Sequence, residues 1–172
     1  MSDWGRLVAR HSAALEEFAL ALRRIQPERW MSPIGPGKWT AAEIASHLSE
    51  SYRVLRSELA GGPGMQLRLR WLHRWLLRYT LLPRILSSGK FPAGARAPRE
   101  TRPREVQPDP KLALLMLRSQ ADAFMQELSD QVRGRPVRLT HAYFGSMTAR
   151  QSLLLVIAHT RHHAQQLTAA AQ

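Results

Sequence analysis

Apolar residues recur at three- and four-residue steps along most of this chain, and no segment alternates for long enough to suggest a sheet. In residues 3–25 the recurring positions are Leu7, Val8, His11, Leu15, Phe18, Leu22 and Ile25. This spacing is typical of an amphipathic helix. The same spacing predicts helices over residues 41–59, 66–88 and 110–130, and a last helix after Thr148. We therefore expect an all-α protein, a four-helix bundle with an extra helix and a Pro-rich crossing between the second and third bundle helices.

Two capping boxes predict where the second and the last helix begin. Residues 40–43 read TAAE and residues 148–151 read TARQ, so a Thr is followed three residues later by Glu or Gln in each. These side chains bond free backbone N–H groups at a helix start. Asp109 and Pro110 are suited to open a further helix as its cap and first residue. The proline-rich segment 89–110 cannot continue a helix and is expected to cross the molecule in an extended form.

His159 and His163 lie four residues apart in the last predicted helix, so both imidazoles project from one face. Val156 and Leu167 share that stripe, which predicts that the pair points inward, whereas the adjacent His162 points about 100° away. His47 occupies the inward stripe of the second predicted helix and is the candidate third ligand. Taken alone, a histidine on an apolar face is more often a core residue, so His47 matters only together with the pair.

The composition limits which metal such a site can hold. The chain has no cysteine, which excludes disulfides, a cysteine nucleophile and thiolate metal sites. Histidine, carboxylate and water remain as ligands, and they suit a divalent ion such as zinc, nickel or iron. The length of 172 residues predicts a single domain over residues 1–172. No apolar run approaches the ~18 residues that span a bilayer, so we expect a cytoplasmic protein without a membrane span.

Positive charge is concentrated in one third of the sequence. Residues 61–111 hold eleven Lys or Arg against three acids, and the whole chain has a formal charge of +12. A solvated basic linker explains this charge, and nothing in the segment marks a base-reading module, so we do not expect nucleic acid as the partner. In the predicted helix 66–88, arginines lie opposite Leu72, Trp75, Leu76 and Tyr79. We expect this apolar side to pack on the bundle or on a partner subunit, with an anionic membrane as the alternative.

Three stretches resemble the DinB/YfiT-like superfamily, close to its DinB_2 branch. They are KWTAAEIASHLSES, SGKFPAGARAPRETRP and HAYFGSMTARQSLLLVIAHTRHHAQQL. The last is the most specific, since it is similar to an HPxFGxLT turn followed by a helix with HxxxH and a Gln three residues later. Ala142 replaces the usual Pro of that turn.

The resemblance implies a four-helix bundle with a metal bound by one His of the second helix and two of the last. By position these are His47, His159 and His163. It also implies that a homodimer is common, and that the fold is shared with mycothiol-dependent isomerases and bacillithiol transferases.

An open three-histidine site supports two enzyme functions on a small-molecule substrate. One is metal-assisted hydrolysis, and the other is transfer chemistry with a low-molecular-weight thiol as cosubstrate. Alternatives are a non-catalytic metal-binding or structural, stress-related bundle, and a basic nucleic-acid- or membrane-binding module. General bases are few: Glu43 serves as a cap, Glu50 as a surface carboxylate, His141 as a turn residue and His162 as an exposed residue or spare ligand. Gln166 could contact a bound water. The catalytic residues stay unknown at this point.

Overall fold

The chain forms a helical bundle in the computed structural model, which describes residues 3–92 and 94–171. Within those ranges the α-helices are α1 (Asp3–Arg23), α2 (Ala41–Leu59), α3 (Trp71–Ser88), α4 (Pro110–Gly134) and α5 (Ala149–Ala170). Two short 3₁₀ turns, η1 (Pro27–Arg29) and η2 (Arg99–Thr101), lie in the connections, and β1 (Arg138–His141) precedes β2 (Gly145–Thr148). No helix of the described ranges is both long and apolar enough to cross a membrane.

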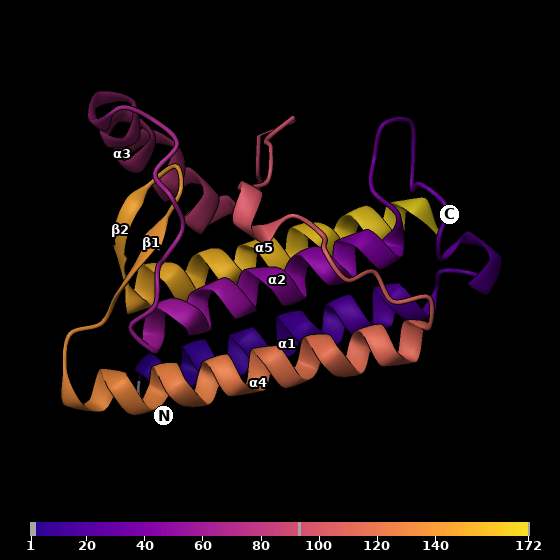
Figure 1. Cartoon of the computed structure of the whole chain (residues 1–172), viewed down its shortest axis with the longest axis horizontal. Coiled ribbons are helices and arrows are strands. Elements are labelled where there is room, and N and C mark those ends of the chain that lie inside the picture. The colour runs from indigo at the N-terminus through magenta and orange to yellow at the C-terminus, as the bar shows by residue number, and fades with distance from the viewer. Residues whose placement is uncertain (1–2, 93, 172) are drawn as a thin grey trace.

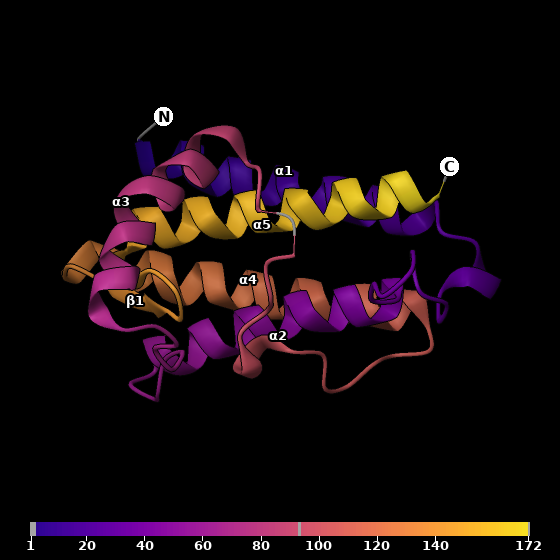
Figure 2. The ribbon, with the colours of Figure 1, turned by 90° about the horizontal axis from the view of Figure 1, so that it is seen from above.

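Four of these helices form the bundle that the sequence predicts. α1 packs along α5 and α2 along α4, and the core between them is apolar. Seen from above, α5 and α2 lie nearer the viewer with α4 visible between them, and α3 lies across one end (Figure 2). The largest side chains of this core are fully buried: Phe18, Trp30, Leu48, Tyr52, Leu117 and Phe124. The predicted all-α four-helix bundle with an extra helix is therefore confirmed.

Both predicted capping boxes are present. The Thr40 hydroxyl accepts the Glu43 backbone N–H at 3.0 Å, and the Glu43 carboxylate accepts the Thr40 N–H at 2.7 Å. Thr148 and Gln151 make the equivalent pair of bonds at 3.2 and 3.0 Å. Because these caps fix the first residue of α2 and of α5, they also fix how far along each helix a later side chain lies.

A small β-hairpin joins α4 to α5, where the sequence predicted only a linker. β1 and β2 pair antiparallel with Leu139 opposite Met147, and both of these side chains are buried. The Glu58 carboxylate of α2 accepts the backbone N–H of Thr140 at 2.9 Å, which ties the hairpin to the bundle. Four residues a strand are too few for alternation to be recognised in the sequence, so this small hairpin was not predicted within the all-α fold.

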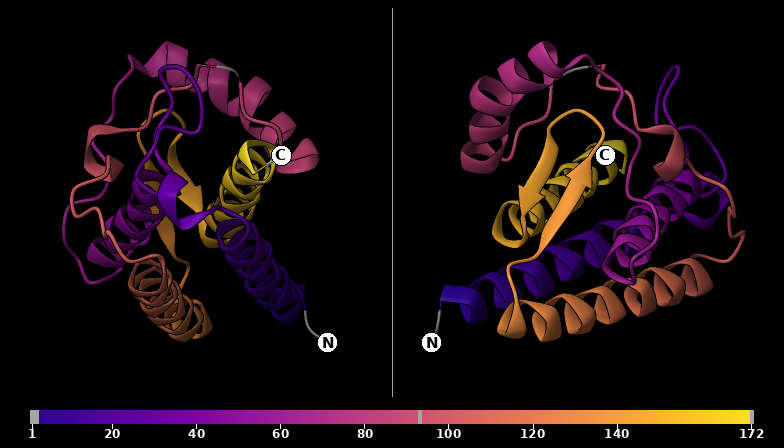
Figure 3. Two further views of the ribbon diagram at one scale, coloured as in Figure 1. Left: turned by 90° about the vertical axis from the view of Figure 1, so that its right-hand side faces the viewer. Right: turned by 60° about the vertical axis from the view of Figure 1, so that its left-hand side comes forward.

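α3 turns its apolar side away from the bundle. Its residues Leu72, Trp75, Leu76 and Tyr79 are 51–62% exposed, so of the surfaces predicted for this side the bundle is wrong, and a partner subunit or an anionic membrane stays a prediction. Leu82 and Ile85 are buried instead. On the bundle side Arg78 donates to the carbonyl oxygens of Phe144 at 3.2 Å and of Ser146 in the hairpin. Figure 3 shows α3 outside the four-helix bundle, beyond the hairpin.

α3 begins later than the predicted segment 66–88 but ends where that segment ends. The helix begins at Trp71, because the residues before it are held differently: the backbone N–H of Arg68 donates to the Ala142 carbonyl at 3.0 Å. Pro83 does not end the helix, which continues to Ser88. Gly89 then ends it with φ of 69°, a left-handed conformation that favours glycine.

A buried polar pair in the core generates a stability prediction. Tyr52 and His11 are 1% and 2% exposed, and the Tyr52 hydroxyl lies 2.8 Å from His11 Nε2. Burial lowers the pKa of His11 to about 4, so the imidazole is neutral at pH 7 and depends on this hydrogen bond. Tyr52→Phe should lower the free energy of unfolding by about 1–3 kcal/mol, because it leaves a buried nitrogen without its partner. Urea unfolding monitored by circular dichroism measures this change.

The matched control is Tyr79→Phe, which removes the same hydroxyl from a side chain that is 62% exposed. We expect the control to change the free energy of unfolding by less than about 0.5 kcal/mol. Equal effects of the two substitutions would contradict the assignment of a stabilising role to the buried pair.

Candidate metal centre

The three predicted histidines meet at one point between α2 and α5. His47 of α2 has its Nε2 3.1 Å from Nε2 of His159, and Nε2 of His163 lies 3.0 Å from the same atom. One nitrogen from each of the three can be chosen so that all lie within 4.8 Å of one another. The cluster therefore joins residues that are 112 positions apart in the sequence.

The helices bring these side chains together in the way that their spacing predicts. His159 and His163 lie one turn apart on α5, with ring centroids 4.6 Å apart. His47 and His163 are 3% and 7% exposed, whereas His159 is half-buried. α2 and α5 belong to different packed pairs of the bundle, and the side chains of His47 and His159 bridge the space between these two helices.

Oxygen acceptors fix the orientation of two of the rings. His47 Nδ1 lies 2.5 Å from the carbonyl oxygen of Thr101 in η2, and His163 Nδ1 lies 2.8 Å from Gln166 Oε1. An oxygen in either place can only accept, so each Nδ1 carries the proton and donates it. In the neutral rings, Nε2 of His47 and Nε2 of His163 then carry no hydrogen, and each directs its lone pair at His159.

The imidazoles of the cluster are neutral at pH 7. Burial lowers the pKa of His47 to about 4, against the smaller opposite effect of the Thr101 carbonyl. Burial, and after it the proximity of His47, lowers the pKa of His163 to about 3. Burial followed by the neighbouring His163 and His47 holds the pKa of His159 well below 6.5. A neutral imidazole is the form that binds a metal ion.

The donor set fits a divalent cation. A single proton on His159 Nε2 cannot donate full hydrogen bonds to the lone pairs of both His47 Nε2 and His163 Nε2. The three nitrogens therefore cannot all be hydrogen-bonded to one another. A metal ion accepts all three. In a tetrahedral zinc site, bonds of ~2.0–2.1 Å separate ligand atoms by about 3.3 Å, slightly more than the 3.0 and 3.1 Å between these nitrogens. Three ligands leave a fourth position for water or substrate.

Aromatic rings border the cluster. The Trp39 ring packs on His47 with centroids 4.9 Å apart, and Phe91 of the crossing packs on His159 at 5.6 Å and on His162 at 5.2 Å. Sequence reasoning did not assign these two residues to the site. They reduce the access of water to the imidazoles and leave the opening on the cavity side.

A cavity of about 1390 Å³ extends from the histidines toward α3 and the hairpin. Much of its wall is apolar and includes Leu77, Leu81 and Ile85 of α3 together with Phe144 and Met147 of the hairpin region. Three cationic residues also line it: Lys38, Arg96 and Arg102. The cavity can thus receive a molecule with an apolar part and an anionic group.

His162 and His141 lie near the cluster without belonging to it. His162 is half-buried rather than exposed, and its Nε2 accepts an N–H of Gln166 at 3.1 Å. Burial, and to a lesser extent Lys38, lowers the pKa of His162. His141 has the turn role that the sequence indicates, since its Nδ1 accepts the Tyr143 backbone N–H at 3.3 Å.

Glu43 and Glu50, the carboxylates about one turn to either side of His47 on α2, are engaged elsewhere. Glu43 closes the capping box of α2, and Glu50 pairs with Arg53 at 2.7 Å. In the described part of the chain no carboxylate belongs to the histidine cluster. The partner of His47 is instead the Thr101 carbonyl, which comes from 54 residues away and has no signal in the sequence. Gln166, which the sequence offered as a contact for a bound water, instead accepts a hydrogen bond from His163 Nδ1 at 2.8 Å.

Comparison with known proteins gives one family and one similar structure. The family model of the DinB superfamily matches residues 10–167. Among solved structures, the chain is similar to YfiT from Bacillus subtilis, described as "a probable metal-dependent hydrolase with an unusual four-helix bundle topology". The TM-score is 0.58 at 16% identity, and the match covers 99% of this chain and 87% of YfiT. No curated protein matches the sequence.

Proposed function

This chain belongs to the DinB superfamily, and from that premise we propose that it is a metal-dependent enzyme whose ion is held by His47, His159 and His163. The proposal rests on the convergence of the Nε2 atoms of three neutral imidazoles. The hydrogen bonds from His47 Nδ1 to Thr101 and from His163 Nδ1 to Gln166 leave a free lone pair on Nε2 of each of these two rings. The description of YfiT as "a probable metal-dependent hydrolase" supports the same function.

A divalent ion with an open position supplies Lewis-acid activation of a water molecule or of a thiol. The protein's own residues orient and enclose the reaction. Thr101 and Gln166 hold two imidazoles in the ligating tautomer, and Trp39 and Phe91 cover the rings. The cationic residues that line the cavity attract an anionic group, while its apolar wall receives the rest of a small-molecule substrate.

Hydrolysis is the first candidate reaction, and thiol-dependent group transfer is the second. Among the described residues, the histidine cluster contains no carboxylate that could act as a base. This favours thiol-dependent transfer, because a thiol activated by the ion needs no protein base. The chain has no cysteine, so the thiol would be a low-molecular-weight cosubstrate. If this cosubstrate carries carboxylates, the cationic side chains of Lys38, Arg96 and Arg102 in the cavity wall would bind them.

We further propose that residues 1–172 fold as one DinB-like domain. The homodimer and the cytoplasmic location expected from the sequence stay predictions. Zinc, nickel and iron all suit three imidazoles, so the identity of the ion is a matter for metal analysis.

The first prediction for the histidine cluster concerns metal binding. The purified protein should bind one zinc, nickel or iron ion, and chelator should lower its melting temperature, because an ion that binds only the folded state stabilises it. The gain is about 2.7 kcal/mol at a free concentration 100 times Kd. His47→Ala should abolish both effects, as measured by plasma mass spectrometry and thermal unfolding.

The control is His73→Ala, which removes an exposed histidine of α3 outside the cluster. It should keep the full metal content. A protein that holds less than stoichiometric metal after supplementation, and that is unaffected by chelator, contradicts the metal site.

Gln166 generates the second metal prediction. Gln166→Leu removes the oxygen that accepts the His163 Nδ1–H, so His163 loses the group that fixes its tautomer. Loss of such a partner lowers metal affinity by about 10–100-fold. Competition with a chromophoric chelator measures the change.

Gln165→Leu is the matched control, because Gln165 is the exposed neighbour on the same helix and is outside the cluster. We expect it to leave the affinity unchanged. If both variants weaken binding equally, the hydrogen bond to Gln166 does not orient the ligand.

The reaction itself is tested on the metal-loaded protein. We expect turnover either of small anionic esters and amides without a cosubstrate, or of electrophiles only when a low-molecular-weight thiol is added. In both cases His47→Ala should reduce kcat/KM to background while His73→Ala retains it. Undiminished turnover in His47→Ala would show that the histidine cluster is not the active site.

A further inference from the structure

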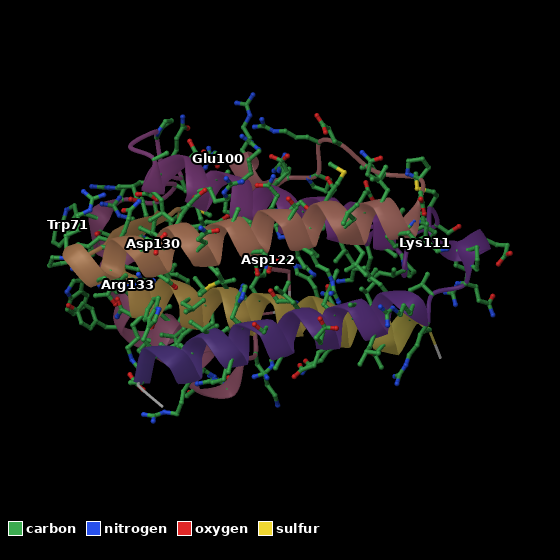
Figure 4. The ribbon with its side chains drawn as sticks, turned by 90° about the horizontal axis from the view of Figure 1, so that it is seen from below. Trp71, Glu100, Lys111, Asp122, Asp130 and Arg133 are labelled. Atoms are coloured by element: carbon green, nitrogen blue, oxygen red, sulfur yellow. The ribbon has the colours of Figure 1, made fainter. Side chains whose placement is uncertain are left out.

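The outer face of α3, formed by Trp71, Leu72, Trp75, Leu76 and Tyr79, is exposed to solvent. The exposed fractions of these five side chains run from 51% for Leu76 to 69% for Trp71. Trp75 and Tyr79 contact each other, with ring centroids 5.1 Å apart, so the aromatic rings form a contiguous patch. Figure 4 shows Trp71 at the edge of the molecule. Large apolar patches of this kind mark interaction sites in soluble proteins.

The opposite side of α3 is already occupied. Leu82 and Ile85 are buried, and Leu77, Leu81 and Ile85 line the cavity of the histidine cluster. The helix therefore cannot bury its outer face by rotating, because rotation would expose an equally apolar inner face. In the part of the chain that the structure describes, no other element covers the outer face.

The charge around this face identifies its partner. Residues 59–99 contain eight Lys or Arg and not one Asp or Glu. Arg70, Arg84 and Lys90 are exposed, and Arg70 and Arg84 lie at the N-cap and in the last turns of α3. The first acid after this stretch, Glu100, is bound to Arg68 at 2.9 Å. A partner for this face must thus be apolar at its centre and negatively charged around it.

We propose that the outer face of α3 docks on a membrane surface rich in anionic phospholipid. Trp, Tyr and Leu side chains enter the boundary between headgroups and acyl chains, and the exposed arginines at the two ends of α3, Arg70 and Arg84, attract the lipid phosphates. A second copy of this chain fits poorly, because a symmetric contact would bring two acid-free basic segments together.

Docking would set the bilayer beside the cavity of the histidine cluster. α3 would have lipid on its outer face and the cavity on its inner face, so one helix would separate the two. The proposal does not depend on the reaction proposed above, since none of the five residues of the outer face lines that cavity.

Cosedimentation of the full chain with vesicles tests this proposal. We expect binding to vesicles of equal parts phosphatidylcholine and phosphatidylglycerol, little binding to pure phosphatidylcholine, and weaker binding as salt is raised. The double variant Trp71→Ser/Trp75→Ser should lower the partition coefficient by about tenfold or more, because two aromatic anchors are lost. Arg70→Gln/Arg84→Gln should lower it by about tenfold or more on the anionic vesicles.

The matched control is Leu20→Ser/Leu115→Ser, which removes two apolar side chains that are 53% and 65% exposed on α1 and α4. It should bind vesicles as the parent does. Thermal unfolding of every variant checks that the fold is kept, and the arginine variant leaves all apolar contacts in place.

Three outcomes overturn the proposal. The first is equal binding to neutral and anionic vesicles, and the second is binding that neither α3 variant reduces. The third is that the protein does not bind vesicles and instead forms a dimer, as measured by sedimentation equilibrium, and that the double variant Trp71→Ser/Trp75→Ser is monomeric. That result would assign the face to contact between copies of the chain.

Discussion

The burial of three neutral imidazoles against one another is the constraint on which the site depends. Without a cation, at least one lone pair of the cluster lacks a donor, and a buried nitrogen without a partner is unfavourable by about 1–3 kcal/mol. The arrangement persists because oxygen acceptors outside the cluster hold the rings: the Thr101 carbonyl fixes His47 and the Gln166 amide fixes His163. The protein thus holds three nitrogens in an arrangement that suits a metal ion.

The proline-rich crossing contributes to the site as much as the bundle does. Its 3₁₀ turn η2 packs on α2 and presents the Thr101 carbonyl to His47, and Phe91 from the same connection covers His159 and His162. Because prolines limit the backbone conformations of the unfolded crossing, ordering it loses less entropy than ordering a flexible loop of that length. A segment without regular structure therefore supplies part of the site.

Local signals in the sequence predicted the parts of the fold that depend on local interactions. The capping boxes at Thr40 and Thr148, the inward stripe of α2 and the i, i+4 histidine pair each involve residues within one helix, so spacing alone predicted them. The hairpin was missed because its stability comes from pairing and from Glu58 of α2, not from a local pattern. The Thr101 contact was missed for the same reason, since nothing in the sequence indicates which carbonyl a crossing will present to a histidine.

The orientation of α3 shows how polar contacts can decide between two apolar faces. Both sides of this helix bear large apolar residues, so the hydrophobic periodicity cannot say which side turns inward. In the observed orientation the Arg78 guanidinium donates to the hairpin carbonyls of Phe144 and Ser146. Hydrogen bonds from a charged donor contribute about 1.5–3 kcal/mol, and this contribution favours the orientation that leaves two tryptophans exposed.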